Sequence, residues 1–580
     1  MRQKNAGKSA SGKSGAAQRL LWILALGLLL VGLGRYVREF IQQRMPLPIA
    51  RLVVSPGSHA SDRLPARPGA LHGQNLLVVT LDTTRPDRLG CYGNHAIETP
   101  NLDRLCARGV VFSGAVATAS STLPSHASIF TGLYPRHHGA RANALYQLGS
   151  EQRTLAEVLS DSGYETAAFV SSFVLDAKFG LAQGFDLYDD AVNPSTTPMG
   201  FADRRGDVTT QRAIQWLEGR PHHRPFFLWV HYYDAHAPYD PPAPFAGRYA
   251  AQPYDGEIAF VDEQVGRLLK AVEATPERET LVVVAADHGE GMGEHGEWSH
   301  ALLVQESTLR IPLILYARTG LPAGLQVAAR VSQVDLTPTI LSLLGIGLPS
   351  DLDGVDLTGP PDPNRPVLAE TVEGRANFGW ARLAALYRGP LKYVEGPHPE
   401  LYDLRSDLLE SNDLLGSRAE DAAAMRRDLR ALEGAAANEL ATAADRLETS
   451  DVERLAALGY VVTGGHAIDA EEQGSDPKEM LPLMTRLQTM VSDFGSYQRW
   501  PAWKRFLAAV TWSSPPRSRP ELIRELEKVA AEHPDFAPVY QYLAVFYRLE
   551  QRPEDAARVL ERRDLLRGTA SPRHEQRAVR

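Results

Sequence analysis

Three segments of the chain are runs of apolar, mostly β-branched or aromatic residues, and an acidic residue follows each of them closely. They span residues 75–81 (NLLVVTL), 225–231 (PFFLWVH) and 280–286 (TLVVVAA). Such runs are typical of parallel strands that are covered on both faces. Ligands of an open α/β sheet bind at the carboxyl ends of its strands, so the residues that follow should converge on one site. The acidic and histidine residues at these positions are Asp82, Asp234, His236, Asp287 and His288.

The acids at the strand ends allow two interpretations. An Asp after a strand commonly caps the next helix, and each one taken alone is explained in this way. Three such strands together, with two histidines adjoining, favour metal ligation. Carboxylate with imidazole is typical of zinc or manganese, whereas calcium and magnesium, which stay possible here, prefer oxygen ligands.

Between the first two of these strands, hydroxyl residues crowd the segment 119–135 (ASSTLPSHASIFTGLYP). The segment has the pattern of a loop that enters a helix. A hydroxyl at a helix N-terminus gains from the backbone N–H groups and from the positive end of the helix dipole, which would stabilise an anion there. A Ser/Thr capping box is the alternative interpretation.

The N-terminal segment combines a basic stretch with an apolar one. Residues 1–19 hold five Lys or Arg and no acid, and residues 20–34 (LLWILALGLLLVGLG) are uncharged. We therefore expect residues 1–45 to form a cytoplasmic basic segment and a single signal anchor in a bacterial inner membrane, which places the remainder in the periplasm. A cleaved signal peptide and a buried helix are the alternatives. Residues 46–74 are rich in Pro, Gly and Ser and are expected to be a linker.

The composition of the chain excludes some classes of function. The chain has 580 residues with 61 Lys and Arg against 70 Asp and Glu, a net charge of -9. Nucleic-acid binding needs a basic footprint, so it is not expected. Two cysteines exclude a disulfide framework, a four-thiolate zinc site and an iron–sulfur cluster within one chain. We expect Cys91 to be a packed apolar residue rather than a nucleophile.

Five motifs resemble the sulfatase family within the alkaline phosphatase superfamily. The resemblance covers about residues 75–415 and implies an α/β sandwich around a large mixed, mostly parallel sheet. It also implies a metal at the strand ends and attack on a sulfate or phosphate ester through a covalent intermediate. The motifs are LDTTRPDRLGCYG (81–93), TPNLDRL (99–105), TLPSHASIFTGLYP (122–135), ADHGEGMGEHG (286–296) and LYDLRSD (401–407).

The resemblance also suggests roles for single residues. Asp82 falls on the first metal ligand of the family, Asp287 and His288 fall on its later ligand pair, and Thr122 falls on the nucleophile. In sulfatases this nucleophile is a Cys or Ser that is converted to formylglycine, and threonine cannot give that aldehyde. The chain departs from the family pattern at three further places, where Thr83 replaces an Asp, His126 replaces an Arg, and VSSF (170–173) replaces a Lys-x-His motif.

Threonine nucleophiles occur in relatives that cleave phosphodiesters, commonly with two ions. By this resemblance the first ion would be held by Asp82, Thr122, Asp287 and His288, and a second by Asp234, His236 and His300. His231 and His295 are substitutes or substrate contacts. We expect the catalytic residues to be Thr122 as nucleophile, His236 and His300 as donors to the leaving oxygen, and His126.

The last third of the chain is expected to be helical. Residues 416–465 have helical spacing and should extend the catalytic domain, and residues 466–580 contain helix pairs, one of which resembles a tetratricopeptide unit. A single unit cannot bury its own face, so this region is either a short array or a helical cap on the enzyme, and it could bind a protein partner.

The function expected from the sequence is a membrane-anchored, metal-dependent hydrolase or transferase with one or two divalent ions. Phosphoester or phosphodiester substrates are favoured. The alternatives are a true sulfatase that uses an unmodified threonine, and a pseudoenzyme that binds partners in the envelope.

Overall fold

The computed structural model describes residues 59–192, 203–221, 223–275, 277–434, 474–499 and 518–566. The expected basic segment and signal anchor (1–45) lie outside these residues. Among the helices that are described, none is both long enough and apolar enough to span a bilayer.

A nine-stranded mixed sheet forms the centre of the molecule, in the order β1-β9-β3-β8-β7-β2-β6-β4-β5. All neighbouring strands are parallel except β8, which is antiparallel to both β3 and β7. The expected large, mostly parallel sheet is thus confirmed. The strands are β1 (His59–Ser61), β2 (Asn75–Leu81), β3 (Val110–Val116), β4 (Glu165–Phe169), β5 (Leu187–Asp189), β6 (Phe226–Tyr232), β7 (Thr280–Ala286), β8 (Leu313–Tyr316) and β9 (Leu325–Ser332).

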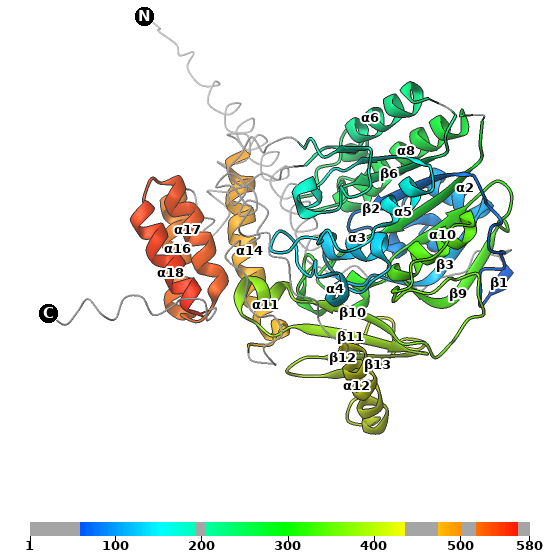
Figure 1. Ribbon diagram of the computed structural model, residues 1–580. Coiled ribbons are helices and arrows are strands. Elements are labelled where there is room, and N and C mark those ends of the chain that lie inside the picture. The colour runs from blue at the N-terminus through cyan, green and yellow to red at the C-terminus, as the bar shows by residue number, and fades with distance from the viewer. Residues whose placement is uncertain are drawn as a thin grey trace, which may run out of the picture.

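Two groups of helices flank this sheet (Figure 1). Within each group the helices contact one another. The first group consists of α2 (Pro100–Arg108), α6 (Gly206–Gly219) and α8 (Pro253–Glu273). The second consists of α3 (Thr122–Thr131), α5 (Leu155–Asp161) and α10 (Leu336–Leu344). Because helices cover both faces, β2 and β6 are buried at every residue.

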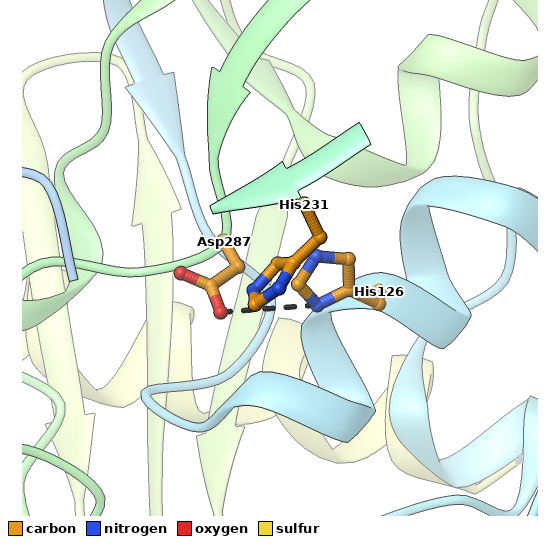
Figure 2. A group of neighbouring side chains, drawn as sticks. All are labelled: His126, His231 and Asp287. Carbon is orange, nitrogen blue, oxygen red and sulfur yellow. Dashed lines mark ion pairs between the residues drawn. The ribbon is translucent and has the colours of Figure 1, made fainter. Parts of the chain in front are cut away.

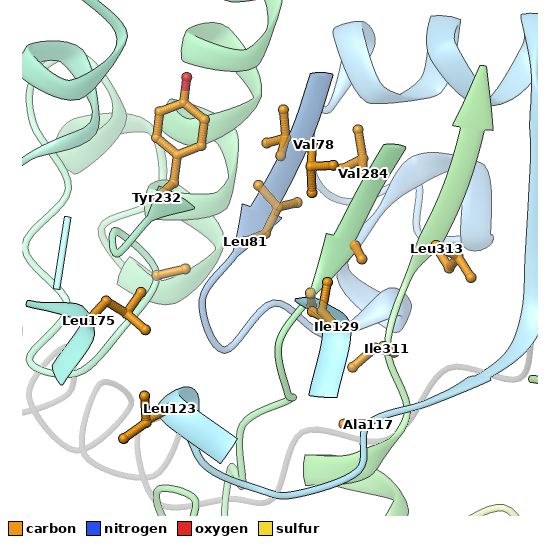
Figure 3. Packing of buried hydrophobic residues seen from close by; sticks show 14 of the residues in the cluster. Val78, Leu81, Ala117, Leu123, Ile129, Leu175, Tyr232, Val284, Ile311 and Leu313 are labelled. Carbon is orange, nitrogen blue, oxygen red and sulfur yellow. The ribbon is translucent and has the colours of Figure 1, made fainter. Parts of the chain in front are cut away.

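The register of the central strands brings their carboxyl ends to one level. Leu81 at the end of β2 lies opposite Tyr232 of β6 and Ala286 of β7. Figure 3 shows the apolar packing beneath this edge, where Val78 and Leu81 of β2 share a core with Val284 of β7. The residues that follow β2, β6 and β7 therefore begin at the same edge of the sheet, as the sequence predicts.

The expected linker is shorter than predicted. Residues 59–61 form β1, which pairs in parallel with β9, and the side chains of Leu64 and Leu71 are fully buried. Residues 59–74, which we expected to be linker, therefore belong to the globular domain.

A second, antiparallel sheet packs beside the first. It consists of β10 (Val367–Thr371), β11 (Leu383–Arg388), β12 (Leu391–Glu395) and β13 (Glu400–Asp403), and α12 (Ala419–Glu433) packs on it. The buried Lys392 of β12 links it to the main domain by ion pairs with Glu306 at 3.2 Å and Glu410 at 2.7 Å. α12 confirms a helix in the predicted extension 416–465, and residues 435–465 lie outside the described chain.

The described residues of the C-terminal region form four helices: α14 (Pro477–Arg499), α16 (Arg519–Glu532), α17 (Ala537–Leu549) and α18 (Pro553–Leu566). α14 docks on the catalytic domain, where the Thr485 hydroxyl donates to the carbonyl oxygen of Gly296 at 3.3 Å. The rings of Trp380 and Phe536 stack at 6.3 Å. The prediction that this region is helical is confirmed. Of the two arrangements that we considered, a helical cap on the enzyme fits α14. The tetratricopeptide assignment stays a prediction.

The two cysteines form a disulfide bond between Cys91 and Cys106. The bond links the turn Gly90–Tyr92 to α2. Cys91 packs against the core, as we expected, but it does so as half of a disulfide bond that we did not expect, because a count of two cysteines does not show how close they lie.

Candidate active site

Asp82 lies at the carboxyl end of β2 and is fully buried. Its Oδ1 is 3.9 Å from His288 Nε2, and its Oδ2 is 3.3 Å from His231 Nε2. Neither oxygen has a hydrogen-bond partner among the described residues. Burial raises the pKa of this carboxyl to about 7, against the opposing effect of His288. A buried, ionised carboxylate without a hydrogen-bond partner raises the free energy of the folded protein unless a cation is near it.

Asp287 and His288 follow β7. Asp287 Oδ1 accepts the backbone N–H groups of Thr83 at 3.2 Å and His288 at 2.7 Å, whereas its Oδ2 accepts none from the described residues. His288 Nδ1 lies 2.9 Å from the carbonyl oxygen of Gly289. A carbonyl only accepts, so Nδ1 carries the proton and Nε2 presents a lone pair. That lone pair is 3.6 Å from Asp287 Oδ2.

Thr122 is the first residue of α3, and its Oγ1 lies 3.4 Å from His288 Nε2. The predicted loop that enters a helix is thus present. The side chain of Ser121, at the N-cap position, hydrogen-bonds Glu373 rather than α3, so the capping-box alternative is not what the structure shows. The N–H of Leu123 is bound by Asn143 Oδ1 at 2.8 Å, which fixes the first turn.

A divalent metal ion fits this arrangement. The ligand atoms of Asp82, Asp287 and His288 all lie within 4.8 Å of one another in a fully buried group. Three carboxylate oxygens without partners among the described residues and one imidazole lone pair, with the Thr122 hydroxyl beside them, form a donor set of the kind that zinc and manganese take.

His126 also lies in this region, as part of a second group with His231 and Asp287 (Figure 2). Its Nδ1 donates to the carbonyl oxygen of Thr122 at 2.8 Å, and its Nε2 accepts from the Thr80 hydroxyl at 2.9 Å. Thr80 in turn accepts from the indole N–H of Trp229 at 2.9 Å. Burial lowers the pKa of His126 to about 3. Both ring nitrogens are therefore occupied, and the imidazole supports α3 instead of offering a ligand atom.

His236 and His300 lie beside the metal ligands. The ring of His300 is 4.4 Å from that of His288 and 4.9 Å from that of His236, between centroids. His300 Nδ1 is 3.0 Å from Glu290 Oε1. Glu290 lies inside the motif 286–296, where nothing in the glycine-rich sequence distinguishes it from the other acids, Asp287 and Glu294.

The structure does not bring Asp234 or His295 into this group. Asp234 Oδ2 accepts the N–H of Gly206 at 2.7 Å, at the start of α6. His295 is exposed, and its Nε2 lies 2.9 Å from the carbonyl oxygen of Leu409. In the described part of the chain, neither group of potential metal ligands includes His236 or His300. The second ion therefore stays a prediction from resemblance.

The sulfatase family model matches residues 74–346. This segment of the chain is therefore similar to the sulfatase family. The chain is 26% identical over 416 residues to the uncharacterized sulfatase YidJ of Escherichia coli K12, which covers 59% of this chain and 83% of that protein. It is also 26% identical over 396 residues to the multifunctional alkaline phosphatase superfamily protein PehA of Trinickia caryophylli, covering 49% and 76%.

Solved structures share the fold of this domain. The phosphonate monoester hydrolase of Agrobacterium radiobacter aligns with a TM-score of 0.53 and 21% identity, covering 62% of this chain and 95% of that chain. A protein solved with its substrate D-glucosamine-2-N,6-O-disulfate aligns with a TM-score of 0.54 and 23% identity, covering 63% and 97%. The relatives also include the N-acetylglucosamine-6-O-sulfatase of Bacteroides thetaiotaomicron, which is 23% identical over 506 residues.

The structure gives a local reason for two of the places where this domain departs from the pattern of the family that it resembles. Thr83, in place of an Asp, donates its hydroxyl to the carbonyl oxygen of Ala235 at 2.6 Å and so ties the loop after β6 to the loop after β2. Ser171, within the VSSF segment, binds the backbone of His231. Neither contact has a sequence signal, because each joins segments far apart in the chain.

Proposed function

We propose that the protein is a metal-dependent hydrolase or transferase of phosphoesters, phosphodiesters in particular, with Thr122 as its nucleophile. One observation carries the proposal: the Thr122 Oγ1 lies 3.4 Å from His288 Nε2, beside a buried Asp82 carboxylate and an Asp287 Oδ2 that have no hydrogen-bond partner among the described residues. A pseudoenzyme that only binds partners would gain nothing from keeping these buried charges.

Asp82, Asp287, His288 and the Thr122 hydroxyl would hold the ion, with zinc or manganese preferred. When bound, the ion supplies positive charge that makes a hydroxyl acidic at neutral pH and that offsets the charge of the transferred group. The buried start of α3 keeps bulk water from Thr122, which is 1% exposed. Thr122 Oγ loses its proton to solvent and attacks phosphorus, and the bond between phosphorus and the departing oxygen breaks. That oxygen takes a proton from His236 or His300; His236 Nδ1–H already donates to the carbonyl oxygen of Ala237 at 2.7 Å, so His236 must first bind a proton at Nε2. Water or an acceptor alcohol then resolves the Thr122 ester.

Two features favour phosphate over sulfate. Threonine cannot give formylglycine, and the positions of the signature Arg and of the Lys-x-His motif hold His126 and the VSSF segment. The site thus lacks the cationic side chains that the resemblance implies for sulfate binding. A true sulfatase that acts through the unmodified Thr122 is the second candidate, and it is favoured by the sulfatases among the relatives.

The test compares Thr122→Ala with Thr131→Ala, which removes a hydroxyl at the other end of the same helix. We expect Thr122→Ala to lower kcat/KM for an aryl phosphodiester by at least about a thousandfold, because the attacking atom is lost. Thr131→Ala should change it less than about threefold. Paired aryl sulfate and aryl phosphate esters separate the two candidates, and wild-type activity in Thr122→Ala would exclude both.

We also propose that residues 20–34 anchor the chain in a bacterial inner membrane, with catalysis in the periplasm. The Cys91–Cys106 disulfide bond supports this placement, because such bonds persist in oxidising compartments. A protein partner for the C-terminal helices belongs to the same proposal, and no nucleic-acid ligand is expected.

A further inference from the structure

His231 is a fully buried residue near the end of β6, and its two ring nitrogens have different neighbours. Nδ1 receives the backbone N–H of Ser171 at 3.3 Å. Nε2 lies 3.3 Å from Asp82 Oδ2. The ring therefore stands between the loop after β4 and the carboxylate at the end of β2.

These neighbours determine which nitrogen of His231 carries the proton. A backbone N–H can only donate, so Nδ1 must accept and is unprotonated. The neutral ring then carries its hydrogen on Nε2, where it faces Asp82. His231 consequently offers no lone pair to a metal ion, although it lies within 4.8 Å of ligand atoms of His126 and Asp287.

The two oxygens of Asp82 face different groups. Oδ2 faces the Nε2–H of His231 at 3.3 Å, and Oδ1 faces the lone pair of His288 at 3.9 Å. His288 and Asp287 are the other potential ligands. Oδ1 is therefore the Asp82 oxygen on the ligand side of the site.

Ser171 holds the His231 ring in place. β4 pairs in parallel with β6, with Phe169 opposite Val230, so Ser171 comes just past the paired residues and beside His231. Its hydroxyl donates to the carbonyl oxygen of His231 at 2.7 Å and is 2.7 Å from the Thr209 hydroxyl. The ring orientation is thus set by backbone and side-chain contacts of one residue.

We propose that His231 is a positioning residue for the metal site: when the ion binds, its Nε2–H hydrogen-bonds Asp82 Oδ2, which lies 3.3 Å away without forming a hydrogen bond in this structure, so that Oδ1 is presented to the ion. This inference rests on the proposed function, and it replaces the substrate contact that we expected for His231. Hydrogen-bond donors to ligand side chains fix ligand orientation, and their loss typically costs 10- to 100-fold in metal affinity.

The test compares His231→Asn with His231→Gln in the full chain. The two amides match in polarity, but the Gln amide reaches the position of Nε2 whereas the Asn amide ends near Nδ1. We expect the dissociation constant for Zn²⁺ and Mn²⁺, measured by competition with a chelating dye, to rise about 10- to 100-fold in His231→Asn. In His231→Gln it should rise less than about threefold. His138→Asn is the control, since it removes a buried imidazole that binds Ser128, at 3.0 Å, and lies outside the site.

The outcomes separate the two proposals. Equal metal affinity of His231→Asn and His231→Gln, with a wild-type protein that binds the ion, would overturn the role of His231 and leave the proposed function intact. A wild-type protein that binds neither ion would overturn the metal site itself. A loss in His138→Asn as large as that in His231→Asn would also overturn the inference, because the effect would then follow from any lost buried histidine.

Discussion

Buried histidines in this protein are held in one protonation state by their neighbours. His126 donates from Nδ1 and accepts at Nε2, and His138 accepts the N–H of Ala140 at 3.1 Å while its Nε2 lies 3.0 Å from the Ser128 hydroxyl. Each ring is neutral, because a second proton would have to enter a low-dielectric interior and displace an existing hydrogen bond. These residues therefore link the stability of the fold to pH.

The effect can be measured at His138, whose pKa is lowered to about 3 by burial. Between pH 6.5 and 3 the unfolded chain binds a proton here and the folded chain does not, so the free energy of unfolding should fall as the pH falls through this range. We expect His138→Asn to reduce this slope by up to about 1.4 kcal/mol per pH unit. Urea unfolding between pH 4 and 7 checks it, and an unchanged slope would contradict the assignment.

At this scale the sequence predicted which residues follow the strands, but not where their side chains point. Asp234 and His236 look like one ligand pair in the sequence. Ala235 between them has a φ of 80°, a left-handed conformation that turns the backbone between the two residues. Asp234 consequently binds the start of α6, whereas His236 lies near His300. Such a turn at a non-glycine residue leaves no trace in the pattern of residues.

At the scale of elements, the loop after β6 depends on a helix that the motifs do not mention. Glu257 of α8 accepts the N–H groups of Ala235 at 2.8 Å and Asp240 at 2.7 Å, one with each carboxylate oxygen. Thr83 binds the carbonyl oxygen of Ala235 from the other side. These contacts fix both ends of the turn that carries His236.

Loss of this support should impair the step in which the leaving oxygen departs. In Glu257→Gln one N–H of the loop faces an amide donor, so His236 is less well placed. We expect kcat to fall about 10- to 100-fold for esters with poor leaving groups, and less than about threefold for p-nitrophenyl esters, which need no donor. Glu263→Gln, an exposed change on the same helix, is the control. Equal losses for both ester classes would argue for general damage instead.

The strands themselves were predictable, because strands that are buried on both faces appear in the sequence as continuous apolar runs. The predicted segments 75–81 and 280–286 coincide with β2 and β7, and the segment 225–231 differs from β6 by one residue. The connecting loops were not predictable, since their shapes follow from hydrogen bonds to residues such as Glu257, 22 positions from Ala235.

At the scale of the whole molecule, one covalent link constrains the first third of the catalytic domain. Cys91 and Cys106 are 15 residues apart, and closing a loop of this size is worth about 3 kcal/mol through the unfolded chain. We expect the double variant Cys91→Ala, Cys106→Ala to lose about this free energy of unfolding in urea. Wild-type protein in the presence of a reductant should show the same loss of free energy of unfolding. Two titratable thiols in the native protein without reductant would refute the pairing.

α14 connects the C-terminal helices to the loop that follows β7, which carries Asp287, His288 and His300. Thr485 binds Gly296, and Glu294, two residues earlier, forms an ion pair with Arg85 at 2.9 Å near the end of β2. A macromolecule that binds these helices and displaces α14 from the catalytic domain must overcome the free energy of this contact. By reciprocity, a substrate that orders this loop would lower the affinity of the protein for such a macromolecule by the same factor. If a partner binds the tail, its binding and the binding of substrate in the site would thus be two halves of one thermodynamic cycle.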